Sequence, residues 1–84
     1  MNIKKGLVVK AAAGKEKGNF FVVLNINGSY INICDGKYRP LEKTKRKNIK
    51  HLFLTTTILD ENSIKTNKNI RKALKNFNEN IKTR

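Results

Sequence analysis

The chain has one histidine, His51, and one cysteine, Cys34, as candidates for chemistry. Nucleophilic catalysis requires such a side chain beside a positioned partner base, and the sequence places no such partner near either residue. A Cys/His zinc site requires four ligands, so one residue of each type cannot build it within the chain. Cys34 ends an apolar segment, which predicts a buried, unreactive thiol. We therefore expect a protein that is not an enzyme and has no metal or cofactor.

Basic side chains, in contrast, are abundant. The 84 residues include 19 Lys and Arg against 6 Asp and Glu, for a formal net charge of +13. An excess of this size usually implies a polyanionic partner, most often nucleic acid and next an anionic membrane. Residues 37–51 and 65–84 each hold seven basic residues and one acidic residue. The surface is therefore expected to have a polarised basic face.

The segment 37–51 concentrates its charge in a short connection. Its central basic residues are Lys43, Lys45, Arg46, Lys47 and Lys50. A charge run is usually only a solvated segment, but in so basic a domain we expect it to contact phosphate groups. Tyr38, between Lys37 and Arg39, is the best candidate to stack on an unpaired base. The alternative is that Tyr38 packs beneath the loop.

A second candidate is the charged loop framed by Gly14 and Gly18. Two glycines permit an unusual backbone at the tip, and Lys15 and Lys17 project from it. Exposed backbone N–H groups at such a turn bind phosphate oxygens, and the lysines add charge. An ordinary hairpin loop with solvated charges is the alternative.

These residues lie on or between short β-strands. Strands are predicted over 6–13, 19–26, 29–34, 37–41 and 52–59, from runs of β-branched and aromatic residues bounded by turn signals. Asn27-Gly28 predicts a type I′ hairpin in which both residues have positive φ, and Asp35-Gly36 predicts a second tight turn. A meander of short strands indicates a small barrel or sandwich, and closure removes the exposed edges of a flat sheet. We therefore expect a mainly β barrel over residues 1–64.

Residues 65–84 are expected to form a basic amphipathic helix and tail. Apolar residues recur there with helical periodicity at Ile70, Ala73, Leu74, Phe77 and Ile81. Thr66 or Asn67 is the expected N-cap. The other face carries Lys68, Arg71, Lys72, Lys75 and Lys82. This basic face is either solvated, while the helix packs on the barrel, or in contact with RNA, and both can hold together.

Length and composition limit the number of domains and the cellular compartment that we expect. A chain of 84 residues predicts one domain with too small a core for a deep catalytic cleft. A single cysteine suits a reducing cytosol, and no signal peptide or apolar membrane span is apparent. We expect a cytoplasmic monomer that does not bind membranes.

Two stretches resemble known families. Residues 6–24, GLVVK followed by GKEKGNFFVVL, look like a KOW motif, in which two strands flank a loop with a characteristic glycine, here Gly14 or Gly18. Residues 35–52, DGKYRPLEKTKRKNIKHL, resemble the corresponding region of the ribosomal protein fourteen family of the archaeal and eukaryotic large subunit. The resemblance covers roughly residues 4–55. Thr44 stands where the family often has proline.

The resemblance implies an SH3-like barrel that binds ribosomal RNA, with the ribosome or ribosomal proteins as partners. It leaves open a constitutive ribosomal protein or an accessory factor. The alternative is a KOW-type protein-interaction module acting in transcription elongation or ribosome assembly. Together with the basic run, it gives the expected RNA-contacting set: Lys10, Lys15, Lys17, Lys37, Arg39, Lys43, Lys45, Arg46, Lys47, Lys50 and His51.

Overall fold

The computed structural model describes the backbone of residues 3–82 and the side chains of residues 3–79. Its elements are β1 (Leu7–Ala11), β2 (Phe20–Asn27), β3 (Tyr30–Cys34), β4 (Lys45–Asn48), the 3-10 helix η1 (Ile49–His51), β5 (Leu52–Ile58), the 3-10 helix η2 (Asn62–Ile64) and α1 (Asn67–Lys82). Within these residues, no helix is long and apolar enough to cross a membrane.

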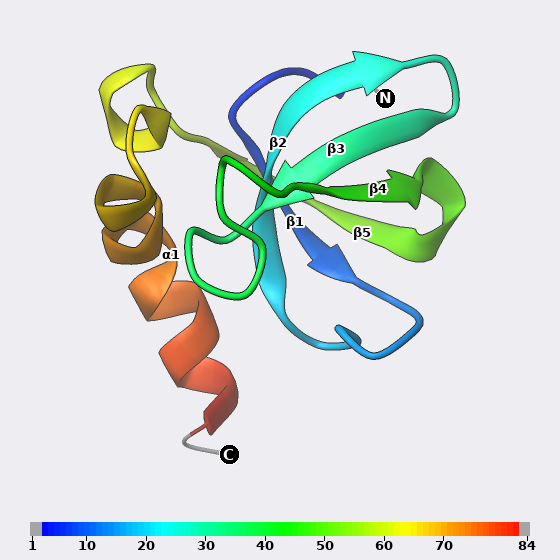
Figure 1. Cartoon of the computed structure of the whole chain (residues 1–84). Helices are drawn as coiled ribbons and strands as arrows, with labels where there is room; N and C mark the ends of the chain where they lie inside the picture. The colour runs from blue at the N-terminus through cyan, green and yellow to red at the C-terminus, as the bar shows by residue number, and fades with distance from the viewer. Residues whose placement is uncertain (1–2, 83–84) are drawn as a thin grey trace.

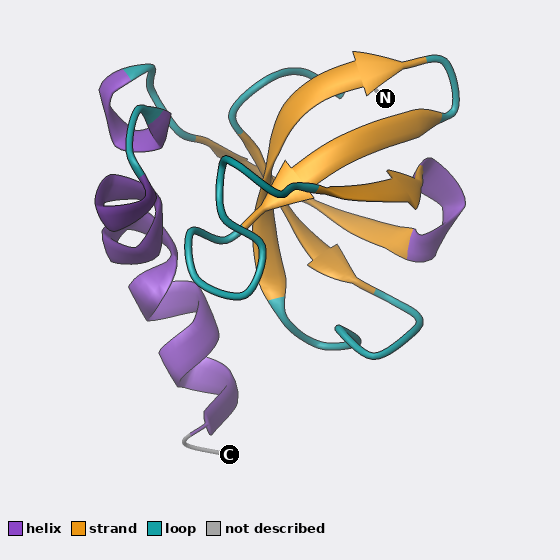
Figure 2. Cartoon of the chain, in the orientation of Figure 1, coloured by secondary structure: helices purple, strands orange, loops and turns teal. Residues whose placement is uncertain are grey.

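The five strands form one antiparallel sheet in the order β4-β3-β2-β1-β5. The first four strands follow one another along the chain, and β5 returns to pair with β1. The helix α1 lies along one side of the sheet (Figures 1 and 2). A mainly β chain with one C-terminal helix is therefore confirmed. The hydrogen-bonded order ends at β4 and β5, so closure into a barrel is not confirmed.

Alternation along the strands builds a hydrophobic cluster on each face of the sheet. Leu7 and Val9 of β1 belong to one cluster, together with alternate residues of β2 and β3. Val8, between them, belongs to the other cluster, which Ile70 and Leu74 of α1 complete. The period of two in the strands thus divides the apolar residues between a sheet-only core and a sheet–helix core.

The helix begins and packs as its sequence predicts. Thr66 is the N-cap, because its Oγ1 accepts a hydrogen bond of 3.1 Å from the Asn69 N–H. Ile70 and Leu74 are buried, and Phe77 is half-buried with its ring centroid 5.2 Å from that of Phe20. Ala73 is also half-buried. The side chain of Ile81, also predicted on this face, lies outside the described residues.

Two asparagines of α1 bind backbone groups that the sheet leaves unpaired. Asn78 Oδ1 accepts a hydrogen bond of 2.9 Å from the Phe20 N–H, at the start of β2. Asn67 Oδ1 accepts one of 2.7 Å from the Leu41 N–H, and its Nδ2 donates to Glu42 Oε1 at 2.7 Å. These bonds fix α1 both to the sheet and to the connection between β3 and β4.

The β2–β3 hairpin forms where predicted, but its turn is of another type. Asn27 pairs with Tyr30, so the two central residues are Gly28 and Ser29. Gly28 has a φ of +65°, and no described residue other than glycine has a positive φ. A single glycine at the first central position is typical of a type II′ turn. The predicted type I′ turn, with Asn27 at positive φ, is therefore wrong, because Asn27 remains in the strand.

The fourth strand is displaced from its predicted position. Residues 37–41 form a loop, because Asp35 Oδ1 accepts hydrogen bonds of 2.9 Å from the N–H groups of Lys37 and Arg39. The N–H groups of Asp35 and Gly36 also donate hydrogen bonds within this loop, to the Arg39 carbonyl oxygen. The strand forms instead over Lys45–Asn48 and pairs with β3. The predicted strand over 37–41 is thus wrong, and Pro40 lies in the loop.

Candidate nucleic-acid interface

The edge strand β4 divides its basic side chains between the two faces of the sheet. Lys45 and Lys47 pair with the buried residues Ile33 and Ile31, whereas Arg46 lies on the opposite face. Charged residues on an edge strand, including inward-pointing ones, discourage pairing with a strand of another chain. The same strand presents positive charge in two directions.

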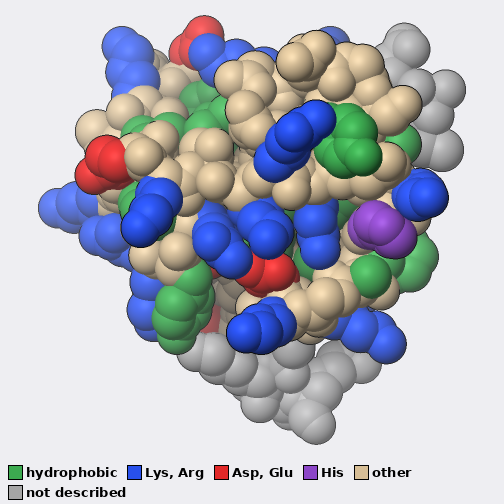
Figure 3. All heavy atoms as spheres, turned by 45° about the vertical axis from the view of Figure 1, so that its right-hand side comes forward, with side chains coloured by type: hydrophobic (Ala, Val, Ile, Leu, Met, Phe, Trp, Pro, Cys, Tyr) green, Lys and Arg blue, Asp and Glu red, His purple; other side chains and the backbone are tan. Residues whose placement is uncertain are grey.

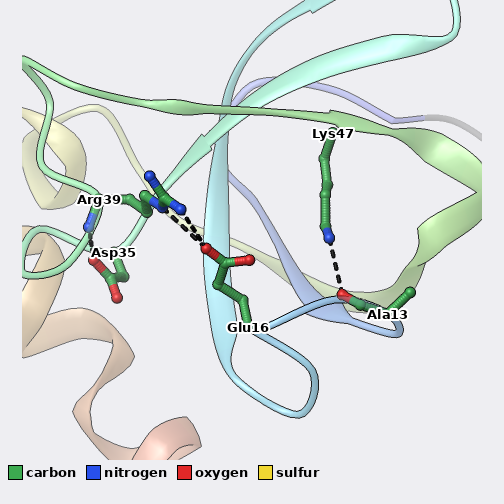
Figure 4. A network of polar contacts seen from close by, with 5 residues as sticks. All are labelled: Ala13, Glu16, Asp35, Arg39 and Lys47. Atoms are coloured by element: carbon green, nitrogen blue, oxygen red, sulfur yellow. Dashed lines mark hydrogen bonds and ion pairs between the residues drawn. The ribbon is translucent and has the colours of Figure 1, made fainter.

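Lys47 is bonded within the fold. Its Nζ donates a hydrogen bond of 2.9 Å to the carbonyl oxygen of Ala13, in the loop between β1 and β2 (Figure 4). Gly14 and Gly18, which frame that loop, have positive φ values of +82° and +91°. The predicted unusual backbone is therefore present, and the half-buried Lys47 holds it against β4.

Arg39 is also paired within the fold, with Glu16 of the same loop. Arg39 Nη2 lies 2.6 Å and Nε 3.1 Å from Glu16 Oε2 (Figure 4). The side chains are 32% and 14% exposed, so the pair is partly shielded from water. The hydrogen bond from Arg39 is the main cause that lowers the pKa of Glu16, and the charge of Lys45 adds to it. Arg39 and Lys47 thus position the loop that carries Lys15 and Lys17.

The loop of residues 35–39 presents Tyr38 to solvent. The two hydrogen bonds to Asp35 Oδ1 fix the backbone on either side of this residue. Tyr38 is 72% exposed, so the alternative in which it packs beneath the loop is wrong. The Nζ of Lys37 lies 5.1 Å from the ring centroid. An exposed ring beside a cation on a fixed backbone is suited to stacking on a planar group.

Arg46 covers the ring of Tyr30, an arrangement that the sequence analysis missed. The guanidinium carbon lies 4.2 Å from the ring centroid, and Tyr30 is still 41% exposed. Beside them, Asn32 Nδ2 donates to Asn25 Oδ1 at 2.8 Å. Because Arg46 is on β4, only the correct strand register could have revealed this contact.

The remaining predicted residues fall into two groups. Lys15, Lys17, Lys43, Lys50 and His51 are exposed. The Ala12 N–H donates a hydrogen bond of 2.8 Å to the His51 carbonyl, which joins η1 to the β1–β2 loop. Figure 3 shows basic side chains gathered on one face of the molecule, close to the histidine. Lys10 forms the second group: it is half-buried, and its Nζ lies 5.7 Å from the Phe20 ring centroid.

Lys37 lies with basic residues of α1 rather than with those of β4. Together with Arg71, Lys72 and Lys75, it lines a groove of about 510 Å³ between α1 and the 35–39 loop. Arg71 and Lys72 precede Lys75 by four and three residues, which places both beside Lys75 on the helix surface. Helical periodicity predicts this face, but the loop opposite to it follows only from the tertiary structure.

The two residues considered for catalysis differ in burial, because His51 is exposed and Cys34 is not. Cys34 is fully buried, as predicted, and burial and then the charge of Asp35 raise the pKa of its thiol to about 12. A neutral thiol is a poor nucleophile. Over the described part of the chain, no group of three or more His, Cys, Asp or Glu is placed to hold a metal ion.

The sequence was also compared with known proteins. No protein-family model matches it, and no curated protein matches it.

Proposed function

We propose that this protein binds structured RNA, specifically ribosomal RNA, through contacts between Lys and Arg side chains and phosphate groups. The observation that carries this proposal is the group of exposed basic residues on neighbouring elements of a domain with a charge of +13. The group comprises Lys15 and Lys17 on the β1–β2 loop, Arg46 on β4, and Lys50 and His51 in η1. Such a cluster provides strong, sequence-independent attraction to a nucleic-acid backbone.

The proposal includes a KOW-type SH3-like barrel as the scaffold. In a flat sheet of five strands, β4 and β5 would lie about 19 Å apart, at about 4.8 Å per strand. Only η1 connects them, and four residue steps from Asn48 to Leu52 span about 8 Å at the rise of a 3-10 helix. A sheet with these connections must therefore curl, so that its two edges approach each other. Curling of this kind favours a barrel.

Within the proposed interface, the basic residues have separate roles. The exposed ones contact phosphate directly, whereas Arg39 and Lys47 shape the β1–β2 loop through Glu16 and Ala13. The working state is a cytoplasmic monomer bound to the ribosome or its precursor, as a constitutive subunit or an accessory factor. No covalent step is required of any residue.

Binding of purified protein to a structured ribosomal-RNA fragment, measured at several salt concentrations, tests the proposal. If about five phosphates are neutralised, log K falls against log salt with a slope of about −3.5 to −4.5. The double variant Arg46→Ala/Lys50→Ala makes the slope shallower by about 1.5. A slope near zero in the unmodified protein would exclude the electrostatic mechanism.

A charge-matched control separates this surface from overall charge. Lys5 and Lys65 flank η2, and Lys5 Nζ lies 3.7 Å from Glu61 Oε1. The variant Lys5→Ala/Lys65→Ala also removes two positive charges, but outside the proposed surface. It should change the slope less than Arg46→Ala/Lys50→Ala does, and equal changes would assign binding to total charge rather than to the proposed surface.

A second candidate function is a protein-interaction module for transcription elongation or ribosome assembly. It is favoured by two apolar side chains on the edge strand β5, because Phe53 is 62% and Ile58 is 50% exposed. Co-purification before and after nuclease treatment distinguishes the two functions. Partners that remain bound after the RNA is digested, and that are lost with Phe53→Ser, support this candidate.

A further inference from the structure

The groove between α1 and the 35–39 loop has the dimensions of a ligand site. Its volume is about 510 Å³, within the range of about 300–1,000 Å³ that is usual for small-molecule sites. One wall is the loop, with Asp35, Lys37 and Tyr38, and the other is α1. The exposed basic cluster on β4 and η1 contributes no residue to it, so this is a separate feature of the surface.

Direct contacts fix the position of the 35–39 loop relative to α1. Arg71 Nη1 donates a hydrogen bond of 2.7 Å to the carbonyl oxygen of Gly36. Gly36 packs so closely on the first turn of α1 that an added Cβ would overlap the Asn67 carbonyl. Asp35 holds the loop from within. The groove is therefore preorganised, and a ligand would bind without first ordering either wall.

The chemistry of the lining matches a nucleotide. Tyr38 offers a largely exposed aromatic face. The Nζ of Lys37 lies 5.1 Å from the centroid of that ring, and Lys72 and Lys75 line the same groove. A flat, uncharged ring in a groove that is also lined by several cations complements a base attached to phosphates.

Two acidic residues also line the groove, and they affect the choice of ligand. Asp35 already accepts two backbone hydrogen bonds, and Glu79 is exposed on α1. Basic groups outnumber them, so an anionic ligand is still favoured. An anion without a ring would leave Tyr38 unused.

We propose that this groove binds one unpaired nucleotide of the RNA, with its base stacked on Tyr38 and its flanking phosphates on Lys37, Lys72 and Lys75. This inference rests on the proposed function and adds a second kind of contact to it. The β4–η1 surface holds the backbone of a structured region, and the groove takes a base that projects from it. Unpaired bases in loops and bulges are the parts of RNA that proteins most readily stack upon.

The test uses two RNA hairpins that differ at one position. The first carries a single bulged adenosine, and the second carries an abasic nucleotide there, so both have the same number of phosphates. Stacking of a base on an aromatic side chain contributes to affinity, so the bulged hairpin should bind about tenfold more tightly than the abasic one. Tyr38→Ala should abolish this difference, and Tyr38→Phe should keep it.

Two further variants complete the design. Tyr30→Ala removes the other tyrosine, which lies against Arg46, and should keep the tenfold difference. Lys72→Ala/Lys75→Ala should weaken both hairpins, with a shallower salt dependence. Equal affinity of the unmodified protein for the two hairpins, or equal losses on both with Tyr38→Ala, would overturn the groove proposal.

The outcomes also separate this inference from the proposed function. If the ribosomal-RNA fragment binds with the expected salt slope while the two hairpins bind equally, only the groove proposal fails. If neither the fragment nor the hairpins bind, both fail. Because Tyr38 is mostly exposed, its replacement should not disturb folding, and thermal unfolding of each variant checks this.

Discussion

The two basic segments of this chain differ in how they use their charge. In residues 37–51, Arg39 is paired with Glu16, and Lys47 is bonded to the Ala13 carbonyl. On α1, Lys72 and Lys75 are exposed and lie along a groove. Charge density in the sequence is similar in the two segments, yet the first uses two basic residues to shape the β1–β2 loop, whereas α1 uses Arg71 in this way, on the Gly36 carbonyl. A count of basic residues therefore overstates the number of phosphate contacts that the first segment can make.

The largest expected effect concerns Gly36, which joins the 35–39 loop to α1. Gly36→Ala should lower the free energy of unfolding by about 3 kcal/mol, measured by urea denaturation. A side chain is strained at its φ of +79°, at a cost of about 1–2 kcal/mol. The added Cβ would also collide with the Asn67 carbonyl, a backbone group that cannot move away easily.

Gly28→Ala is the matched control. Gly28 also has a positive φ, of +65°, but a Cβ there would meet open space. This variant should cost only about 1 kcal/mol, the part due to the backbone. Equal costs at the two glycines would mean that the contact between loop and helix is not rigid, and the preorganisation argued for the groove would be lost.

The pair between Glu16 and Arg39 gives the next largest effect. Glu16→Gln should lower the free energy of unfolding by about 1 kcal/mol at neutral pH, because a charge-assisted hydrogen bond is lost in a partly buried setting. The lowered pKa of Glu16 fixes the sign of the pH dependence. The pair stabilises the fold above the ordinary pKa of 4.5, and this stabilisation is lost as pH falls through the lower pKa of the folded state.

Urea denaturation between pH 3 and pH 7 measures this effect, and Glu61→Gln is its control. Lys5 and Glu61 form an ion pair of 3.7 Å whose side chains are 57% and 76% exposed. Removal of that pair should leave both the stability and its pH profile unchanged. An unaltered acid profile in Glu16→Gln would assign the acid loss to other carboxylates.

Lys47 gives a smaller effect. Lys47→Met keeps most of the alkyl chain but removes the donor to the Ala13 carbonyl, and should cost about 0.5–1 kcal/mol in urea denaturation. Lys50→Met removes the same charge from an exposed residue and should not change stability. If the two variants were equally stable, Lys47 would have to be returned to the phosphate-contacting set.

The sequence predicted the parts of the fold in which apolar residues repeat. Runs of β-branched and aromatic residues identified β1, β2, β3 and β5, and helical spacing identified α1. It could not predict β4, because Lys-Arg-Lys-Asn has no apolar period and forms a strand only by pairing with β3. Likewise, the side chain of Asp35 accepts the hydrogen bonds that close a loop, so residues 37–41 do not form the predicted strand.

Prediction of the candidate site was limited in the same way. The list of basic residues followed from composition, but their division into paired and exposed groups depends on contacts between distant residues. Arg39 and Glu16 are 23 positions apart, and Lys47 and Ala13 are 34 apart. The groove likewise needs α1 and the 35–39 loop to meet. Pairings of this kind are set by the fold and leave no local pattern in the sequence.

The smallest expected effect on stability is the one that bears most on function. Lys72→Ala/Lys75→Ala should change the free energy of unfolding by less than about 0.5 kcal/mol, because both residues are exposed on α1. In RNA binding, the same variant should make the salt slope shallower by about 1.5, for two lost phosphate contacts.

Arg39→Ala should behave in the opposite way: it should lower stability by about 1 kcal/mol and leave the salt slope nearly unchanged, because its charge is already paired with Glu16. Measuring both quantities on both variants tests whether the two segments differ as the structure indicates. A slope that changes equally in the two variants would show that Arg39 exchanges Glu16 for phosphate on binding. The 37–51 segment would then contribute more contacts than its free structure suggests, and Glu16→Gln, which releases Arg39, should in that case strengthen binding to RNA.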